Sequence, residues 1–512
     1  MIRTRVLGWA AIAAILLGVT ASFAVETPKS TKDTLMWGSR SEPASLDPST
    51  SKDTVTHSVI LQIYDTLIAT DSKDYNKFIP CLATDWQFSN DKKELTFTIR
   101  QGVKFHNGDV MTADDVVYSL NRSLKSSYSS GIRGPLQSFE KVDNTHVKAV
   151  LKHPYAPILD VMSNYTFAIA SKRAVEEAEA KGINFARNPC GTGAYKMKEW
   201  RSGDQLVLER FDDYWNGPAP IKTVIYKLIP DTASGAIALE DGSIDFYQPA
   251  HSDYQYLDTV DNLSSVTNPG IGVHHIIFNV TDGIFTDKRL RQAVAYALNR
   301  QDIIIGGCEG HAELANMLCP TSIFGYDKEG KWYSQDLKKA KELMAEAGYP
   351  NGFDVVFRMN SSDTYMKPAE VVQDQLRQIG INVTFDKMER STYLDLVAGK
   401  RQFIISLYMI NATVRDADFV LNRRVHGSMI GGGNNYAGYN NLNVNKWIEE
   451  ARQESDPAKR MEIYRKVYAQ LKEDIPYIPL YTSYNKCYFN KHLKGIYPHP
   501  VERHPIHEMY FD

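Results

Sequence analysis

Two glycine clusters have the residue types of a phosphate-binding loop, but neither has the context of one. Residues 191–193 (Gly-Thr-Gly) precede a strand-like segment, whereas a nucleotide-binding glycine loop opens a helix. The three glycines at 431–433 are followed by Asn434, Asn435 and Tyr436 rather than by Lys and Ser or Thr. We therefore expect loops without phosphate at both places, and we expect the second loop to lie beside a cleft.

Histidines form two groups that could bind a metal. His274 and His275 are adjacent on a predicted strand, so their side chains point to opposite faces and cannot both bind one ion. His499, His504 and His507 lie in a proline-rich C-terminal segment, where irregular chain ends are usually mobile and solvated. We expect structural roles for the first pair, a solvated tail for the other three, and no metal cofactor.

The cysteines are odd in number, so at least one is unpaired. Cys308 and Cys319 are close enough in the sequence to close a short loop by a disulfide, which would add about 3 kcal/mol of stability. His311 lies between them, but three ligands with this spacing match no common zinc pattern. A disulfide is the favoured interpretation, followed by free thiols and then by a metal.

The sequence contains neither a Gly-x-Ser-x-Gly elbow nor a His-Glu-x-x-His helix. We therefore expect no catalytic residues and favour a binding protein over a hydrolase. The composition is that of a globular protein, with 43% hydrophobic and 23% charged residues in 512. The formal charge of -3 gives no electrostatic reason to expect nucleic acid as a partner.

Residues 1–24 have the pattern of a secretory signal peptide. Arg3 and Arg5 precede an apolar stretch at 6–21, and Ser22-Phe23-Ala24 has small residues at the usual cleavage positions. The apolar stretch is shorter than the ~20 residues of a membrane span, and no cysteine follows the cleavage site for lipid attachment. The sequence thus predicts an exported, periplasmic protein.

Strands and helices alternate along the rest of the chain. Residues 95–99 alternate apolar and polar side chains like a half-buried strand, and Thr112 is placed to cap a helix directly afterwards. Residues 290–298 and 337–347 have apolar positions at helical spacing. Mixed elements with short connections indicate an α/β architecture.

Several segments, in order, resemble extracellular solute-binding protein family 5, the dipeptide and oligopeptide receptors of ABC importers. They include LTFTIRQGVKFHNG at 95–108, TADDVVYS at 112–119, GTGAY at 191–195, DYW at 213–215, GSID at 242–245 and RLRQAVAYALNR at 289–300. The resemblance covers essentially the whole chain after residue 24. It implies a periplasmic-binding-protein-like Venus flytrap of type II, cluster C, with two lobes that enclose a ligand and an extra subdomain in the first lobe.

The family order implies boundaries for these parts. The first lobe is expected to comprise residues 25–69, 189–284 and 481–512, the extra subdomain residues 70–188, and the second lobe residues 285–480. The resemblance also implies a membrane permease as partner, a monomer as the free state, and no cofactor.

One second-lobe loop departs from the best-known peptide receptors, which carry an aspartate there for the peptide's amino group. Thr413 takes the place of that aspartate, and Ile410 takes the place of a common tryptophan. Asp416 and Asp418 lie slightly downstream and could bind the amine or cap the next helix. The sequence at 416–419 is similar to that of the glutathione-binding branch, so a modified or internal amine is expected.

The other predicted ligand-binding residues follow from the same resemblance. Lys367 and Arg415 are candidates for the ligand's carboxylate, although Lys367 could equally be a solvated helix residue. Asn435 and Tyr436 are expected in a cleft loop, with Ser45 in a first-lobe turn. The favoured ligand is a small peptide, including glutathione-like peptides. The alternatives are an opine, oligosaccharide or metal chelate on the same scaffold, or else an exported hydrolase or chaperone-like binder.

Overall fold

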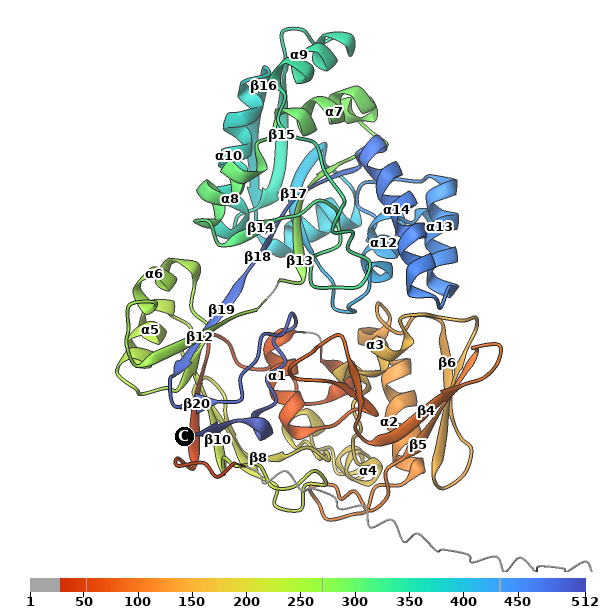
Figure 1. Cartoon of the computed structure of the whole chain (residues 1–512), viewed down its shortest axis with the longest axis vertical. Helices are drawn as coiled ribbons and strands as arrows, with labels where there is room; N and C mark the ends of the chain where they lie inside the picture. The colour runs from red at the N-terminus through yellow and green to blue at the C-terminus, as the bar shows by residue number, and fades with distance from the viewer. Residues whose placement is uncertain (1–27, 52, 269, 432–433) are drawn as a thin grey trace, which may run out of the picture.

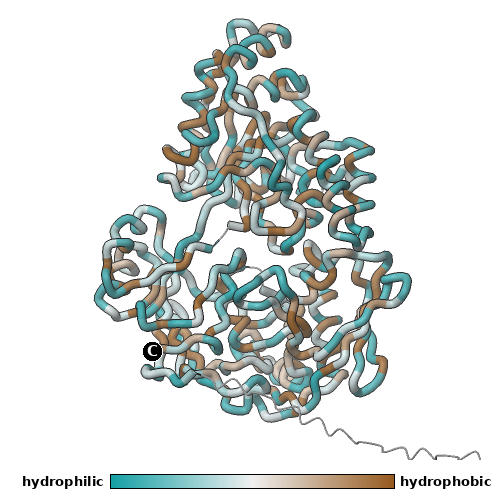
Figure 2. Tube along the Cα trace, in the orientation of Figure 1, coloured by the Kyte–Doolittle hydropathy of each residue, from teal (hydrophilic) through white to brown (hydrophobic). Residues whose placement is uncertain are grey.

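The computed structural model describes residues 28–51, 53–268, 270–431 and 434–512, and it has two lobes (Figure 1). The predicted signal peptide at 1–24 lies outside the described residues. Within the described ranges, no helix has the length and apolar character needed to cross a membrane. Figure 2 shows hydrophobic stretches running through the interior of both lobes, with hydrophilic stretches on their outer turns.

The first lobe is built on a seven-stranded sheet. Its strand order is β12-β19-β11-β1-β10-β9-β8, so segments from the beginning, middle and end of the chain pair side by side. Helices α1 (Thr54–Ile63), α5 (Thr232–Glu240) and α6 (Tyr254–Leu257) accompany this sheet. The strands are β1 (Thr34–Ser39), β8 (Tyr195–Arg201), β9 (Gln205–Arg210), β10 (Thr223–Leu228), β11 (Phe246–Tyr247), β12 (Leu263–Asn268) and β19 (Asn485–Asn490).

A separate four-stranded sheet with the order β4-β5-β7-β6 falls within the range expected for the extra subdomain. Its strands are β4 (Ala83–Phe88), β5 (Glu94–Ile99), β6 (Leu136–Lys141) and β7 (His146–Leu151). The side chains of β5 alternate between buried and half-buried, as the sequence predicts. The predicted cap of the next helix, α2 (Ala113–Lys125), is also confirmed, because Thr112 and Asp115 form a capping box.

Shorter elements complete the first lobe. Helices α3 (Ile158–Met162) and α4 (Lys172–Ala180) follow the four-stranded sheet. Strands β2 (Ile68–Thr70) and β3 (Phe78–Pro80) form a small hairpin, and β20 (Leu493–Lys494) pairs with β21 (Tyr510–Phe511) at the chain's end.

The second lobe is built on a six-stranded sheet with the order β14-β18-β13-β17-β15-β16. These strands are β13 (Gly272–Phe278), β14 (Ala312–Leu314), β15 (Phe353–Asn360), β16 (Ile381–Met388), β17 (Ile405–Asn411) and β18 (Tyr477–Ser483). The helices of this lobe are α7 (Lys288–Ala297), α8 (Arg300–Cys308), α9 (Leu337–Glu346), α10 (Asp363–Arg377), α11 (Arg390–Tyr393), α12 (Ala417–Val425), α13 (Leu442–Gln453) and α14 (Pro457–Asp474).

The chain passes between the two large sheets twice, at neighbouring segments that form the hinge (Figure 1). The first passage lies between β12 and β13, and the second lies at Tyr484 between β18 and β19. Gly270 is at the first passage, where an added Cβ would lie 2.3 Å from the carbonyl oxygen of Ser483 on the second. The two segments therefore pack closely enough to require glycine at this point.

These passages differ from the expected boundaries at residues 284–285 and 480–481. β13 lies in the range assigned to the first lobe, yet it pairs with β17 and β18 of the six-stranded sheet. Most of β18 lies in the range assigned to the second lobe and pairs there, but its last residues continue past the expected boundary. An apolar strand does not reveal in its own sequence which distant strand it will pair with, so these boundaries depend on the tertiary structure.

The C-terminal segment is buried rather than solvated, so the expectation of a mobile tail is wrong. His499 is 1% exposed and His504 is 5% exposed. The main chain of Ile506 donates a hydrogen bond to Gln62 in α1, and Thr31 bonds to Phe511 at the chain's end. This segment is held in place by residues that are far away in the sequence. Its proline content alone does not indicate these contacts.

The predicted disulfide is not formed, because all five cysteines are buried free thiols. Cys308 packs in α8 within the core of the second lobe, while Cys319 belongs to a different hydrophobic cluster and its thiol faces the carbonyl oxygen of Pro320. Burial raises the pKa of the Cys308 thiol above its ordinary value. Closeness in sequence therefore did not bring the two sulfurs together.

The glycines at 191–193 serve close packing rather than phosphate binding. The main-chain nitrogen of Gly193 donates to the carbonyl oxygen of Ile63 at 2.9 Å, and the ring of His106 bonds to the Gly193 carbonyl. A Cβ at Gly193 would lie 2.5 Å from the carbonyl oxygen of Gln62. The C-terminal end of α1 thus leaves no room for a side chain.

We predict that Gly193→Ala destabilises the first lobe, because backbone atoms of α1 cannot move away as a side chain can. The free energy of unfolding should fall by about 1–3 kcal/mol, as in other overpacked sites. The matched control is Gly399→Ala, where the nearest atoms to an added Cβ lie at 3.8 Å. Thermal unfolding followed by circular dichroism measures both variants, and equal melting temperatures for the two would contradict the prediction.

Candidate functional site

A cavity of ≈ 920 Å³ lies between the two lobes and is lined by both. The first lobe contributes Ser51, His57, Ser127, Tyr128, Ser130, Gly131, Ile132, Asn164 and Thr166. The second lobe contributes Arg390, Leu394, Tyr408, Met409, Ile410, Asn411, Thr413, Phe419, Asn422, Arg423, Arg424, Met429, Asn434 and Tyr436. We call this cavity the interlobe cleft. Its volume lies in the range typical of sites for small ligands.

Tyrosines form one wall of the cleft. Tyr408 lies on β17 and stacks on Tyr365 with ring centroids 5.6 Å apart, and on Tyr393 at 5.1 Å. Tyr436 lies 6.3 Å from Tyr408, and its hydroxyl donates a hydrogen bond to the side chain of Asn434. Tyrosine rings are amphipathic and can offer both apolar faces and hydroxyl groups to a ligand. This combination suits peptide-like solutes whose side chains vary.

Helix α12 places two adjacent arginines at the cleft. The side chain of Asp416 accepts a hydrogen bond from the main chain of Asp418 and so begins the helix. Near its other end, Arg424 is 5% exposed, and its guanidinium lies 4.1 Å from the ring centroid of Tyr436. Arg423 donates to the carbonyl oxygen of Gly131 in the first lobe at 3.3 Å.

The first lobe faces these arginines with neutral polar groups. Asn164 begins a short 3-10 helix that carries Thr166. Burial lowers the pKa of His57 to about 4, and the nearby charge of Arg503 lowers it further in the same direction. His57 is therefore uncharged near neutral pH, and this wall contributes hydrogen-bonding groups without charge.

The structure brings three of the predicted ligand-binding residues into the cleft. Ile410 and Thr413 line it at the end of β17 and in the loop that follows, and Tyr436 lines it from the loop after α12. Thr413 is exposed toward the cavity, whereas Ile410 is only 3% exposed.

Arg415 joins the lobes instead of lining the cleft. Its Nε donates to Asp160 of α3 at 2.7 Å, and its guanidinium lies over the ring of Phe78 at 5.5 Å. The side chains of Arg415 and Asp160 are 6% and 9% exposed, respectively. This ion pair is thus almost fully buried between the second lobe and the first.

The two predicted aspartates are also engaged by protein groups. Asp416 forms an ion pair with Arg460 at 2.8 Å and accepts a hydrogen bond from Tyr464. Asp418 accepts a hydrogen bond from Tyr155 of the first lobe at 3.1 Å and forms an ion pair with Arg452. Both are buried, and neither lines the cleft.

Three further predicted residues lie outside the cleft lining. Lys367 is exposed on α10 and pairs with Glu309 at 3.1 Å. Ser45 bonds to the side chain of Thr50 within a first-lobe turn. Asn435 is 2% exposed and binds the main chain on both sides of its loop, so it orders the loop that carries Tyr436.

Sequence reasoning missed the arginines of the cleft. Arg423 and Arg424 follow the predicted acidic loop by less than three turns of helix, and Arg390 begins α11. A signal existed in the adjacent Arg-Arg pair, because arginines are seldom buried without a partner and two of them side by side are rarely placed for packing alone. Only the lobes' arrangement shows that both face a cavity.

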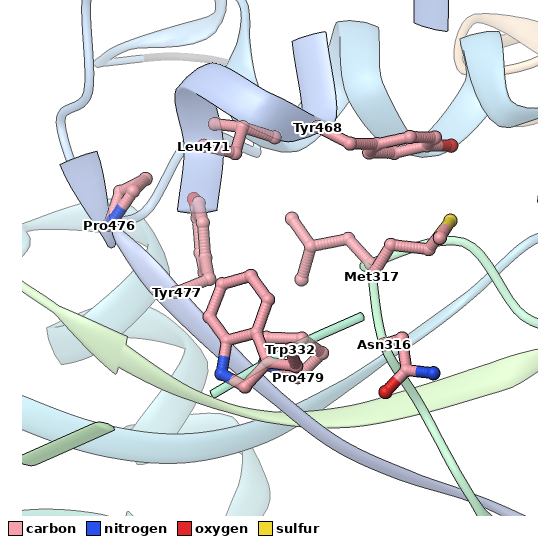
Figure 3. Close-up of a pocket in the computed structure, with 9 residues that line it drawn as sticks. Asn316, Met317, Trp332, Tyr468, Leu471, Pro476, Tyr477 and Pro479 are labelled. Atoms are coloured by element: carbon pink, nitrogen blue, oxygen red, sulfur yellow. The ribbon is translucent and has the colours of Figure 1, made fainter. Parts of the chain in front are cut away.

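A second pocket, drawn in Figure 3, is too small to be the site. It has a volume of ≈ 20 Å³ and lies inside the second lobe, where Trp332, Tyr477 and Pro479 are among the residues that line it. This volume holds about one water molecule. The buried Nε1 of Trp332 has no hydrogen-bond partner among the described groups.

In the described part of the chain, no three His, Cys, Asp or Glu side chains gather in a group that could hold a metal ion. His274 and His275 are buried on β13, and burial lowers the pKa of each to about 3. His274 stacks on Tyr481 with ring centroids 4.5 Å apart. Both histidines are thus packed within the second-lobe sheet, as the sequence indicates.

We predict that Asp160→Asn weakens the contact between the lobes, because Arg415 then keeps a buried charge without a carboxylate. Ligand affinity should fall about tenfold or more if closure depends on this pair. The control Asp114→Asn removes an exposed carboxylate that pairs with Lys141 on the subdomain's surface. Small-angle X-ray scattering should show a larger radius of gyration for Asp160→Asn alone, and unchanged scattering would contradict the prediction.

We also predict a pH dependence from Asp418. Burial raises its pKa from 3.8 to about 6, so the folded protein binds this proton more tightly than the unfolded chain does. Stability from this group is therefore complete below 3.8 and is lost as the pH rises through about 6. The variant Asp418→Asn has no carboxyl to titrate at this position. Its melting temperature minus that of the parent should therefore increase as the pH rises from 3.8 to about 6.

The control for this measurement is Asp261→Asn, which alters an exposed carboxylate away from the cleft. Its melting temperature should follow that of the parent at every pH. A constant difference between Asp418→Asn and the parent from acid to neutral pH would show that this carboxyl titrates normally in the folded protein.

The described geometry agrees with three comparisons to known proteins. Residues 77–432 match the family model described as bacterial extracellular solute-binding proteins, family 5 Middle. The chain is 30% identical over 491 residues to the oligopeptide-binding protein AppA of Bacillus subtilis, covering 91% of this chain and 89% of that one. It is 28% identical to the glutathione-binding protein GsiB of Salmonella paratyphi A, covering 94% and 95%.

A solved structure has the same fold. The periplasmic binding protein DppA of Helicobacter pylori, in complex with the peptide STSA, superposes with a TM-score of 0.80 at 27% identity. The match covers 93% of this chain and 98% of that one. The expected Venus flytrap architecture is thereby confirmed.

Proposed function

The chain belongs to family 5 of the bacterial extracellular solute-binding proteins, and we propose that it captures small peptides for an ABC importer. On this proposal the two lobes close around a di- or oligopeptide, or a glutathione-like peptide, and the closed protein delivers it to a membrane permease. The protein binds its ligand without chemical change. It works outside the cytoplasmic membrane, in the periplasm, as a monomer.

The single observation that carries the proposal is the interlobe cleft. Its volume of ≈ 920 Å³ is enclosed by residues of both lobes, so a bound solute would touch both. A ligand that contacts both walls stabilises the closed arrangement by its differential affinity for it. A ligand bound to one lobe alone would not favour the closed arrangement that a permease could recognise.

The hinge and the contact between the lobes fit this mechanism. Rotation needs changes only at the two short passages, one between β12 and β13 and one at Tyr484, while the three large sheets keep their pairing. On the other side of the cleft, the main-chain nitrogen of Ala156 donates to the carbonyl oxygen of Arg452 at 2.9 Å. This bond and the Arg415–Asp160 pair form when the lobes meet, so they add to what the ligand contributes.

The composition of the cleft supports a peptide ligand. Tyr408 and Tyr436 offer stacking surfaces, and Asn164, Thr166 and Asn434 offer groups for the amides of a peptide backbone. Such contacts recognise the main chain and leave the side chains of the ligand free to vary. A non-peptide solute such as an opine, an oligosaccharide or a metal chelate is the alternative on the same scaffold.

The first test is native mass spectrometry of the purified protein, followed by denaturation and identification of any released solute. We expect a peptide with a mass that fits the cleft, because escape requires the lobes to open. The variant Tyr436→Ala removes part of the cleft wall, so a smaller fraction of the purified protein should retain the solute. A released sugar, opine or metal chelate would reject the peptide assignment and leave the fold untouched.

A further inference from the structure

The interlobe cleft carries positive charge and no negative charge among its described lining residues. Arg390, Arg423 and Arg424 line it, and none of the other lining residues is Asp, Glu or Lys. His57 adds no charge near neutral pH, because burial holds its pKa low. An empty cleft of this kind attracts anions and repels cations before any specific contact forms.

The buried arginine of this group lacks a full set of partners. Arg424 is 5% exposed, and its Nη1 donates to the carbonyl oxygen of Asn434 at 2.8 Å. Its Nε is buried without a hydrogen-bond partner among the described groups. A guanidinium has five donors, and a buried unfilled donor is costly unless something else accepts from it.

The buried carboxylates around α12 do not neutralise this charge, since Asp416, Asp418 and Asp160 each serve another arginine. Asp416 pairs with Arg460, and Asp418 pairs with Arg452 and accepts from Tyr155. In the first lobe, Asp160 pairs with Arg415 at the contact between the lobes. The acids that surround α12 are therefore committed to protein cations.

Arg423 reinforces the unbalanced charge. Its guanidinium lies 4.9 Å from the ring centroid of Phe419, and its one hydrogen bond among the described groups is to a main-chain oxygen, that of Gly131. Two adjacent guanidinium groups repel each other when nothing negative lies between them. An anionic group bound to both would remove that repulsion and offer bidentate geometry.

We propose that the solute is an acidic one, which places a carboxylate on Arg423 and Arg424 and needs no free ammonium group for binding. This inference rests on the proposed function, because it specifies the class of solute enclosed in the same cleft. The expected ligands are peptides with net negative charge, including those whose amine is modified or internal. An α-ammonium group would find no carboxylate partner on the described cleft walls.

The test uses isothermal titration calorimetry on the full chain, stripped of ligand by denaturation and refolding. The probes are trialanine with free termini, its N-acetylated form and its C-terminal amide, together with glutathione. Acetylation removes the positive charge and amidation removes the negative one, while the backbone stays the same. We expect the acetylated peptide to bind at least as tightly as the free form, and the amide to bind about tenfold or more weakly.

Two variants assign the effect to the arginines. Arg423→Gln and Arg424→Gln should each weaken binding of the acetylated peptide and of glutathione by about tenfold or more. The control Arg377→Gln removes a cation that pairs with Asp374 on α10, outside the cleft. If Arg424→Gln fails to fold because its bond to Asn434 is lost, Arg423→Gln and the peptide series still decide the question.

The outcomes separate this inference from the proposed function. Equal or tighter binding of the amide overturns the acidic-solute inference and leaves the peptide receptor standing. Binding of a dicarboxylic opine with no binding of any peptide rejects the peptide function and supports the acidic-solute inference. Failure of every probe to bind, the amide included, overturns both.

Discussion

The buried pair of Arg415 and Asp160 is the interaction on which the functional geometry depends. It joins the second lobe to the first across their interface, with both side chains almost removed from solvent. Buried charges must be paired to be tolerated, so the pair sets the separation of the lobes within a narrow range. That separation in turn creates an enclosed cleft from two surfaces that would otherwise be open.

The same principle of pairing organises the charges around α12. The acids at the beginning of this helix are matched one by one with arginines from α13 and α14. Among the described groups, the arginines near its end donate hydrogen bonds to main-chain oxygens and have no carboxylate partner. The helix thus has a neutralised end that packs against the first lobe and a positive end that faces the cleft. On the proposed function, this one helix would serve both closure and ligand selection, because each task uses a different turn.

Much of the fold was predictable from local sequence, and the predictions failed where distant segments decide. The strand at 95–99 and the capping of α2 by Thr112 follow from alternation and residue type, and the structure has both. The lobe boundary expected near residue 285 differs from the structure, because β13 pairs with β17 and β18, which lie far along the chain. The expected bridge between Cys308 and Cys319 failed for a similar reason, since the two thiols pack in different cores.

The candidate site shows the same division. By itself, the sequence determined the resemblance to a family of solute-binding proteins and the departure at Thr413 from the aspartate that this resemblance places there. Only the tertiary structure decided that Asp416, Asp418 and Arg415 pair with protein groups, and that Arg423 and Arg424 face the cleft. The physical reason is that a charged residue has no fixed role in sequence. Its role depends on which opposite charge the folded chain brings within reach, and here those partners lie on other elements.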